Sequence, residues 1–191
     1  MDEIKEFFEK AAINWHNSDD LSLVRKILNE IGLKKGDKVL DVGCGKGIIT
    51  PLIYEITDAP VKAIDISENM ISGAKQIYPK SKSLIFECHD FYEYNDDIKY
   101  DYLILYNAYP HFLDRFALSN KANELLSKNG KLVIAHGMSK EALFKHHKGL
   151  NSKICRMIEA PIEESKAFFD HFDLEKWVDN EIYYLMVLKK K

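Results

Sequence analysis

Residues 37–50, Asp-Lys-Val-Leu-Asp-Val-Gly-Cys-Gly-Lys-Gly-Ile-Ile-Thr, constrain the fold of this chain more than any other segment. A short apolar run reaches Asp41, and glycines then occupy every second position at Gly43, Gly45 and Gly47. Because glycine has no Cβ and adopts positive φ freely, a strand that ends in such a turn brings bare backbone close to a ligand. A carboxylate just before the first glycine favours a nucleoside ligand with a cationic end.

The length and composition are those of one globular α/β domain. The chain has 191 residues, of which 46% are apolar, and this is enough for a sizeable core. The net charge of −3 lacks the basic excess of a nucleic-acid-binding domain. No secretory signal or run of roughly 18 apolar residues is visible, and three scattered cysteines favour a reducing compartment. The sequence therefore predicts a cytoplasmic protein with no nucleic-acid or membrane partner.

Strand-like and helix-like segments alternate along most of the chain. Helices are expected at 2–14, 19–31, 46–56, 68–78, 114–128, 139–148 and 162–170. Strands are expected at 38–42, 61–66, 83–88, 101–106, 131–136, 172–178 and 182–189, the last two joined by a tight turn at Asp179-Asn180. The order predicts a doubly wound, seven-stranded, mostly parallel sheet with a C-terminal antiparallel hairpin. We expect one domain over 1–191, with a helical cap at 1–34 and the core at 35–191.

Polar and aromatic side chains follow three of the predicted strands. Asp65 ends the second strand, Asp90 and Phe91 follow the third, and Asn107 follows the fourth. In a doubly wound sheet, ligands bind beyond the carboxyl ends of the strands, where the strand order reverses. A carboxylate at Asp65 can accept both hydroxyls of a ribose. An acid and an aromatic ring after the third strand suit an adenine.

A dinucleotide-binding fold is the main competing interpretation of the glycine-rich turn. Its fingerprint, Gly-x-Gly-x-x-Gly/Ala, needs a small residue where this chain has Ile48, and Gly47 falls one residue early. Asp41 would also place a negative charge near the pyrophosphate, which is repulsive. A sulfonium or an ammonium group suits Asp41 better.

These motifs resemble those of class I S-adenosylmethionine-dependent methyltransferases. Val39–Gly47 is similar to their first motif, and Ala63–Ser67 is similar to the second-strand motif. Cys88–Phe91 resembles the adenine-contact region. Leu125–Leu132 resembles the segment before the fifth strand, with Asn129-Gly130 where Pro-Gly is usual. The resemblance implies a Rossmann-like fold, S-adenosylmethionine as the cofactor and S-adenosylhomocysteine as its product.

The resemblance also implies roles for individual side chains. Asp41 would serve the ammonium group of the cofactor, directly or through water, and Asp65 would bind the ribose hydroxyls. The glycine turn would approach the methionine part, and the residues after the third strand would contact the adenine. The residues implied to bind the cofactor are Asp41, Gly43, Cys44, Gly45, Gly47, Asp65, Ile66, Met70, Asp90, Phe91 and Asn107.

The segment after the fourth strand is expected beside the transferable methyl group. His111 is the candidate general base, because the unperturbed pKa of histidine lies near neutrality. Tyr109 is the candidate for orienting a substrate. A purely loop-stabilising role for His111 and Asn107 is left open. Trp15, in the N-terminal segment, is either a lid over the cofactor or an ordinary packing residue.

The chain offers histidines that converge on the same edge of the predicted sheet. His111, His136 and either His146 or His147 would give three nitrogen ligands, the number found in open catalytic zinc sites. Independent surface or capping histidines are the competing interpretation, and we predict no metal.

The sequence predicts a methyltransferase that acts on a small molecule, with an oligomeric state that it does not define. Two alternatives stay open. One is a regulatory protein that binds S-adenosylmethionine without turnover, and the other is an oxidoreductase that uses a nicotinamide cofactor.

Overall fold

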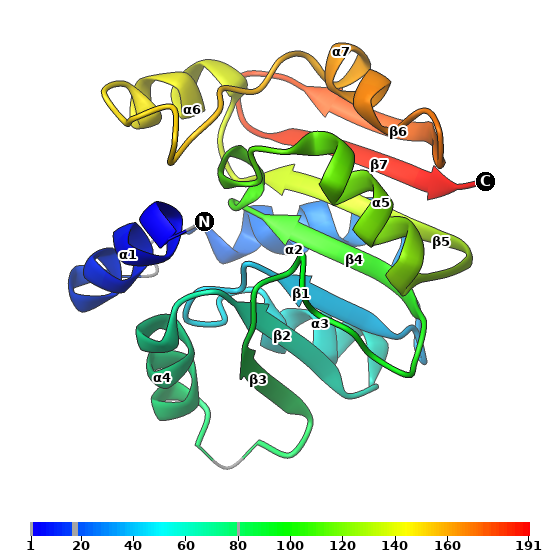
Figure 1. The fold of residues 1–191 in the computed structure, drawn as a ribbon. Helices are drawn as coiled ribbons and strands as arrows, with labels where there is room; N and C mark the ends of the chain where they lie inside the picture. Colours follow the sequence, from blue (N-terminus) through cyan, green and yellow to red (C-terminus); the bar gives the residue numbers. More distant parts are fainter. Residues whose placement is uncertain (1, 17–18, 80) are drawn as a thin grey trace.

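A seven-stranded sheet forms the centre of the molecule. The computed structural model describes residues 2–16, 19–79 and 81–191. The strand order is β3-β2-β1-β4-β5-β7-β6, and β7 runs antiparallel to both of its neighbours while the others are parallel (Figure 1). The predicted doubly wound sheet with a C-terminal hairpin is confirmed. The strands are β1 (Val39–Val42), β2 (Val61–Asp65), β3 (Leu84–Cys88), β4 (Tyr100–Tyr106), β5 (Leu126–His136), β6 (Phe172–Asp179) and β7 (Tyr184–Lys190).

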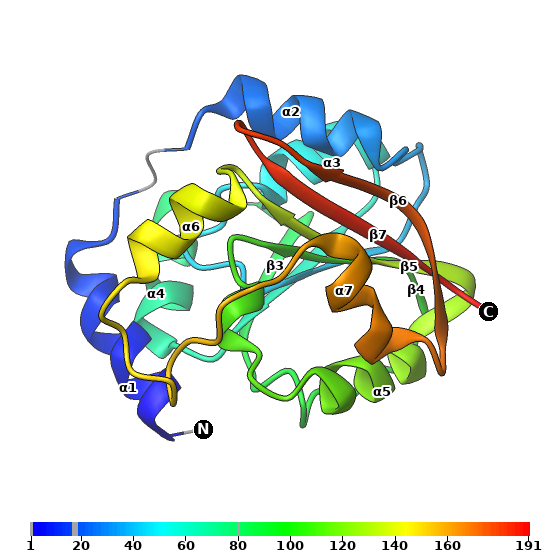
Figure 2. The same cartoon turned by 90° about the horizontal axis from the view of Figure 1, so that it is seen from above.

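Helices cover both faces of the sheet. The helices are α1 (Asp2–Ala11), α2 (Leu21–Glu30), α3 (Thr50–Thr57), α4 (Glu68–Ile77), α5 (Arg115–Leu125), α6 (Lys140–His147) and α7 (Pro161–Ser165), and the 3₁₀ helices are η1 (Ala12–Asn14), η2 (Tyr109–His111) and η3 (Lys166–Phe168). Figure 2 shows α2 and α3 on one side of the sheet and α5 on the other. Helices α1, α4 and α6 lie at the end toward which β4 and β5 point (Figure 1).

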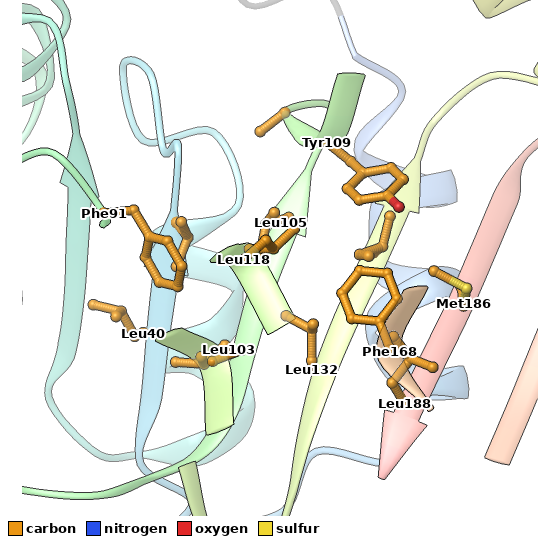
Figure 3. Packing of buried hydrophobic residues seen from close by; sticks show 14 of the residues in the cluster. Leu40, Phe91, Leu103, Leu105, Tyr109, Leu118, Leu132, Phe168, Met186 and Leu188 are labelled. Carbon is orange, nitrogen blue, oxygen red and sulfur yellow. The ribbon is translucent and has the colours of Figure 1, made fainter. Parts of the chain in front are cut away.

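The core follows from the alternation of side chains along the strands. On one face, Leu103 and Leu105 of β4 pack with Leu118 of α5 in a cluster that also contains Phe168 (Figure 3). On the other face, Ile104 packs with apolar residues of α2 and α3. Helix α2, which lies within the predicted cap over 1–34, therefore packs directly on the sheet. The division of the chain into a cap over 1–34 and a core over 35–191 stays a prediction.

Several element boundaries differ from those expected; for example, the helix expected at 162–170 is the short α7 followed by η3, and the helix expected at 2–14 is α1 followed by η1. Helix α3 begins at Thr50 instead of residue 46, because residues 43–49 form a turn in which three glycines have positive φ. Helix α5 ends at Leu125, and the chain enters β5 five residues earlier than expected. The last hairpin is wider than a two-residue turn, since residues 180–183 connect β6 to β7.

Within the part of the chain that the structure describes, no helix is both long enough and apolar enough to cross a membrane.

Candidate functional site

A cavity lies at the carboxyl ends of β1, β2, β3 and β4. The strand order reverses between β1 and β4, and this is where ligands bind in open α/β sheets. The space between its walls is about 950 Å³ when the open mouth is included. Its walls come from the turns after these four strands and from the N-terminal segment.

The glycine turn after β1 forms one wall. Gly43 has φ of +71°, and a Cβ there would lie 2.8 Å from the Cβ of Ala108, so only glycine lets the turn approach the loop after β4. The backbone N–H groups of Gly43 and Cys44 both donate to the carbonyl of Ile64, at 2.8 and 3.0 Å. Burial raises the pKa of the Cys44 thiol well above its usual value, so this cysteine stays protonated. The turn thus offers bare backbone to a ligand.

Asp65 lies on the wall at the end of β2. It accepts hydrogen bonds from the backbone N–H groups of Gly45 and Ser67, each at 2.9 Å. Ser67 in turn caps α4 by accepting from the N–H of Met70 at 3.1 Å. Burial raises the pKa of the Asp65 carboxyl to about 6. The carboxylate is therefore fixed in orientation while it faces the cavity.

The residues after β3 form the next wall. Asp90 accepts from the N–H of Tyr92 at 2.9 Å, which orients its carboxylate in the turn. Phe91 is almost completely buried, and its ring meets that of Phe112 edge to face at 5.7 Å between centroids. An aromatic surface and a carboxylate are thus present together at this end of the cavity. The predicted residues that share the cavity wall are Gly43, Cys44, Gly45, Asp65, Ile66, Met70, Asp90, Phe91, Asn107 and His111.

Two predicted cofactor residues, Asp41 and Gly47, do not line the cavity. Asp41 is only 1% exposed, and it accepts a hydrogen bond from the Thr50 hydroxyl at 2.7 Å. Burial raises the pKa of Asp41 to about 7. At Gly47 a Cβ would lie 2.7 Å from the ring of Phe86, so this glycine is required for packing. Since Asp41 is buried and does not line the cavity, its contact with the ammonium group, directly or through water, stays a prediction.

The loop after β4 brings in an acid that the motifs did not indicate. Asn107 has φ of +54°, and its side-chain oxygen Oδ1 accepts from the N–H of Gly137 at 3.0 Å. Its side-chain nitrogen Nδ2 donates to the Asp19 carboxylate at 2.8 Å. Asp19 lies on the cavity wall. The sequence carried little signal for it, because an acid just before a helix is typical of a cap, and the adjacent Asp20 does cap α2.

His111, in η2, lies on the wall where the predicted general base was expected. Its Nδ1–H donates to the carbonyl of Ile154 at 2.9 Å, so Nε2 is the unprotonated nitrogen of the neutral ring. Burial lowers the pKa of His111 to about 4. The ring of Phe8, from α1, packs edge to face against it at 4.8 Å between centroids. His111 is therefore a neutral hydrogen-bond acceptor near pH 7.

Tyr109 corrects one expectation. The side chain is fully buried in the core and does not line the cavity (Figure 3). Its hydroxyl donates to the Glu164 carboxylate at 2.5 Å, and the guanidinium of Arg115 lies over its ring at 3.6 Å from the centroid. Burial thus contradicts a direct contact between Tyr109 and a substrate in this cavity. The residue instead anchors η2, which carries His111.

The histidines approach one another without forming a metal site. The rings of His111 and His147 are 5.3 Å apart between centroids, and His146 packs beside His147 at 5.2 Å. His136 is fully buried against the ring of Tyr184. Within residues 2–16, 19–79 and 81–191, no group of three His, Cys, Asp or Glu side chains has an arrangement that could hold a metal ion.

The N-terminal segment contributes to the cavity wall. Phe8 and Trp15 both line the cavity, and a lid role for Trp15 stays a prediction. The carboxylate of Glu9 accepts from the N–H groups of Glu68 and Asn69 at the start of α4, at 2.7 and 3.1 Å. These contacts dock α1 beside the cavity, and the sequence alone did not indicate Glu9 or Phe8.

Residues 33–189 match the family model described as a methyltransferase domain. Since the match covers more than half of the chain, the chain belongs to this family. With the glycine turn and the acids after β2 and β3, the class is that of S-adenosylmethionine-dependent methyltransferases of class I.

Relatives and solved structures agree with this class. Malonyl-[acyl-carrier protein] O-methyltransferase 1 from Ilyobacter polytropus is 29% identical over 132 residues, or 69% of this chain and 47% of that protein. The chain thus spans about half the length of the curated relatives that it matches first. Magnesium protoporphyrin IX methyltransferase from Synechocystis, solved with bound S-adenosylhomocysteine, has a TM-score of 0.71 at 16% identity, covering 100% of this chain and 99% of that one. The protein solved with the Haloferax volcanii activator Trm112 has a TM-score of 0.74 at 18% identity, covering 88% of each chain. These two structures support the fold alone.

Proposed function

We propose that this chain transfers a methyl group from S-adenosylmethionine to a small-molecule acceptor and releases S-adenosylhomocysteine. The observation that carries the proposal is the composition of one cavity wall. It combines the bare backbone of the glycine turn with the carboxylates of Asp65 and Asp90, at the strand-order reversal of a methyltransferase-domain fold.

The wall residues divide the cavity into three parts along the strand ends. Phe91 and Asp90, after β3, would hold the adenine by packing and by a hydrogen bond from its amino group. Asp65, at the end of β2, would accept the ribose hydroxyls, since its carboxylate is already oriented by two backbone donors. The glycine turn after β1 would lie against the methionine part, where side chains would be in the way.

Buried acids around the turn favour a cationic ligand. The pKa of Asp65 is raised to about 6 and that of Asp41 to about 7, because burial disfavours their charged forms. A positive charge in the cavity stabilises both carboxylates, whereas a pyrophosphate would make their burial more costly. This electrostatic preference supports a sulfonium cofactor over a nicotinamide dinucleotide.

The chemistry asks the protein mainly for alignment. When bound, S-adenosylmethionine supplies the electrophilic methyl carbon. Nε2 of His111 would accept a hydrogen bond from an O–H or N–H of the acceptor. This bond would orient a lone pair of the acceptor atom toward the methyl carbon of the bound cofactor. A pKa of about 4 makes the imidazole a weak base, so orientation is its larger contribution.

The surroundings of His111 support a small organic acceptor. The ring of Phe8 packs against that of His111 at 4.8 Å between centroids, and Phe112, the next residue along the chain, also lines the cavity. An aromatic, partly covered space suits an apolar or aromatic body that carries one polar nucleophile. The named proteins that resemble this chain include one for malonyl-[acyl-carrier protein] and one for magnesium protoporphyrin IX.

Calorimetry followed by an acceptor screen tests the proposal. We expect S-adenosylmethionine and S-adenosylhomocysteine to bind and NADH not to bind. Small alcohols, carboxylic acids, amines and thiols would then be screened for release of S-adenosylhomocysteine. Binding of NADH without binding of S-adenosylhomocysteine would favour the oxidoreductase alternative. Tight cofactor binding with no product from any acceptor would favour the regulatory one.

A further inference from the structure

Asp19 places a negative charge on the cavity wall that no sequence motif accounts for. Its Oδ1 accepts hydrogen bonds from the amide nitrogen of Asn107 at 2.8 Å and from the hydroxyl of Tyr106 at 3.0 Å. Both donors are neutral. No ion pair among the described residues includes Asp19. The carboxylate is therefore fixed in place with its charge uncompensated.

Among the described wall residues, no lysine or arginine pairs with Asp19. Within the described ranges, Lys46 is the only lysine or arginine on the wall. Its ammonium donates to the backbone carbonyl of Trp15 at 3.0 Å, which ties the glycine turn to the N-terminal segment. The other charged groups on the same wall include the acids Asp65 and Asp90. A ligand group that carries a positive charge would thus be attracted to Asp19.

The position of Asp19 along the sheet edge indicates which part of the cofactor it meets. Tyr106, which bonds to Asp19, is the last residue of β4, and Asn107 follows it. Asp90 and Phe91 instead follow β3, at the other end of the cavity. Neighbouring strands lie about 4.8 Å apart, so β3 and β4 are separated by roughly 14 Å across β2 and β1. With the adenine at β3 and the ribose at Asp65 of β2, the amino-acid end of the cofactor extends past β1 toward Asp19.

We propose that Asp19 binds the ammonium group of the methionine part of S-adenosylmethionine. This inference rests on the proposed function, and it moves to Asp19 the direct contact that the resemblance implied for Asp41. Asp41 is buried and does not line the cavity, and its carboxylate accepts a hydrogen bond from the Thr50 hydroxyl. Asp19 lies on the cavity side, where its two neutral donors leave the rest of the carboxylate free to accept from a charged N–H donor. Its orientation by Asn107 and Tyr106 before binding lowers the entropic cost of the contact.

Comparison of two nucleoside ligands tests this assignment. S-adenosylhomocysteine carries the ammonium group, whereas 5′-methylthioadenosine has the same nucleoside and sulfur but no amino-acid end. In Asp19→Asn, the side chain keeps its shape and an oxygen that can accept from Asn107, and only the charge is lost. We expect calorimetry to give more than tenfold weaker binding of S-adenosylhomocysteine to Asp19→Asn, with the affinity for 5′-methylthioadenosine within twofold of wild type. The matched control is Asp20→Asn, since Asp20 caps α2 and does not line the cavity.

Each outcome has one meaning. Unchanged affinity of Asp19→Asn for S-adenosylhomocysteine would overturn the assignment and leave the proposed function standing. Equal weakening for both ligands would also overturn it, because Asp19 would then act only by holding the loop after β4. Failure of the wild-type chain to bind either ligand would instead contradict the proposed function. Retained binding of 5′-methylthioadenosine shows in the same experiment that the variant is folded.

Discussion

The two ends of the cavity are built in different ways. At the end formed by β1, β2 and β3, the wall comes from strand–turn–helix units whose polar groups bind backbone nearby. Asp65, for example, accepts from the turn after β1 and from the start of α4. At the end formed by β4, side chains are held by segments far away in the sequence. His111 bonds to Ile154, and Tyr109 bonds to Glu164.

This difference shows which features of the sequence position the residues at each end of the cavity. The end proposed to bind the nucleoside depends on short motifs, because a glycine turn and an acid at a strand end position each other through local backbone geometry. The end proposed to bind the acceptor depends on tertiary packing, because η2 is fixed by α7 and by the chain between α6 and α7. A change at the first end should therefore alter cofactor binding, and a change in η2 or its supports should alter stability or turnover. Asp19, held by Tyr106 and Asn107, is the residue of the β4 end that we expect to alter cofactor binding.

The largest expected effect is on stability, at the acceptor end. Glu164 faces the guanidinium of Arg115 at 3.5 Å, and both side chains are almost fully buried. Glu164→Ala leaves that guanidinium buried without an anionic partner, and we expect the free energy of unfolding to fall by about 3–5 kcal/mol. Urea unfolding measures it. The adjacent, exposed Glu163 pairs with Lys166 on the surface, so Glu163→Ala should cost less than about 1 kcal/mol. Equal losses in the two variants would contradict the role of this buried pair.

The next effect is on cofactor binding, at the nucleoside end. Asp65→Ala removes the acceptor for the ribose hydroxyls, and we expect S-adenosylhomocysteine to bind more than tenfold more weakly, because a hydrogen bond to a charged group contributes about 1.5–3 kcal/mol. Calorimetry gives the affinity, and circular dichroism checks the fold. Asp58→Ala is the control, since Asp58 is exposed and pairs with Lys35. An unchanged affinity would show that the ribose lies elsewhere.

A smaller, graded effect is expected from pH. The pKa of Asp65 in the folded protein is raised to about 6 by burial, and the ionised form is the one that accepts from the ribose. Lowering the pH from 7 to 5 protonates Asp65, so the affinity for S-adenosylhomocysteine should fall, by at most about tenfold per pH unit below 6. Titrations at several pH values test it. If Asp65→Asn kept the same pH dependence, the titrating group would be another residue.

The smallest expected effect on cofactor affinity comes from His111. The ring of His111 lies at the end proposed to bind the acceptor and packs edge to face against Phe8. Since we expect no contact between this ring and the nucleoside, His111→Asn should change the affinity for S-adenosylhomocysteine by less than about twofold. A tenfold loss would remove the distinction between the two ends. Once an acceptor is known, the rate with the same variant shows what the imidazole contributes, and an unchanged rate would exclude it from catalysis.

Local patterns were enough to predict the fold and to find most of the residues after β1, β2 and β3 that share the cavity wall. The cap at Ser67, the strand end at Asp65 and the turn with Gly43 each depend on a few neighbouring residues. The predicted start of α3 was four residues too early, because the helix-like spacing of apolar residues continues back into the glycine turn. The positive φ angles in that turn exclude an α-helix. Local patterns therefore fail where backbone conformation overrides apolar spacing.

Residues governed by distant contacts were not predictable in the same way. Tyr109 was expected beside the substrate, because its sequence position could not reveal the buried partners Glu164 and Arg115. Asp19 was missed for the converse reason, since its role depends on Asn107, which lies 88 residues further along the chain. Which side of a turn a side chain occupies, as for Asp41, is likewise decided by packing.

A crystal structure with S-adenosylhomocysteine tests the central claim most directly. We expect the adenine beside Phe91, the ribose hydroxyls on Asp65 and the sulfur against the glycine turn after β1. A ligand bound in any other part of the molecule, or an empty cavity at saturating concentration, would contradict it.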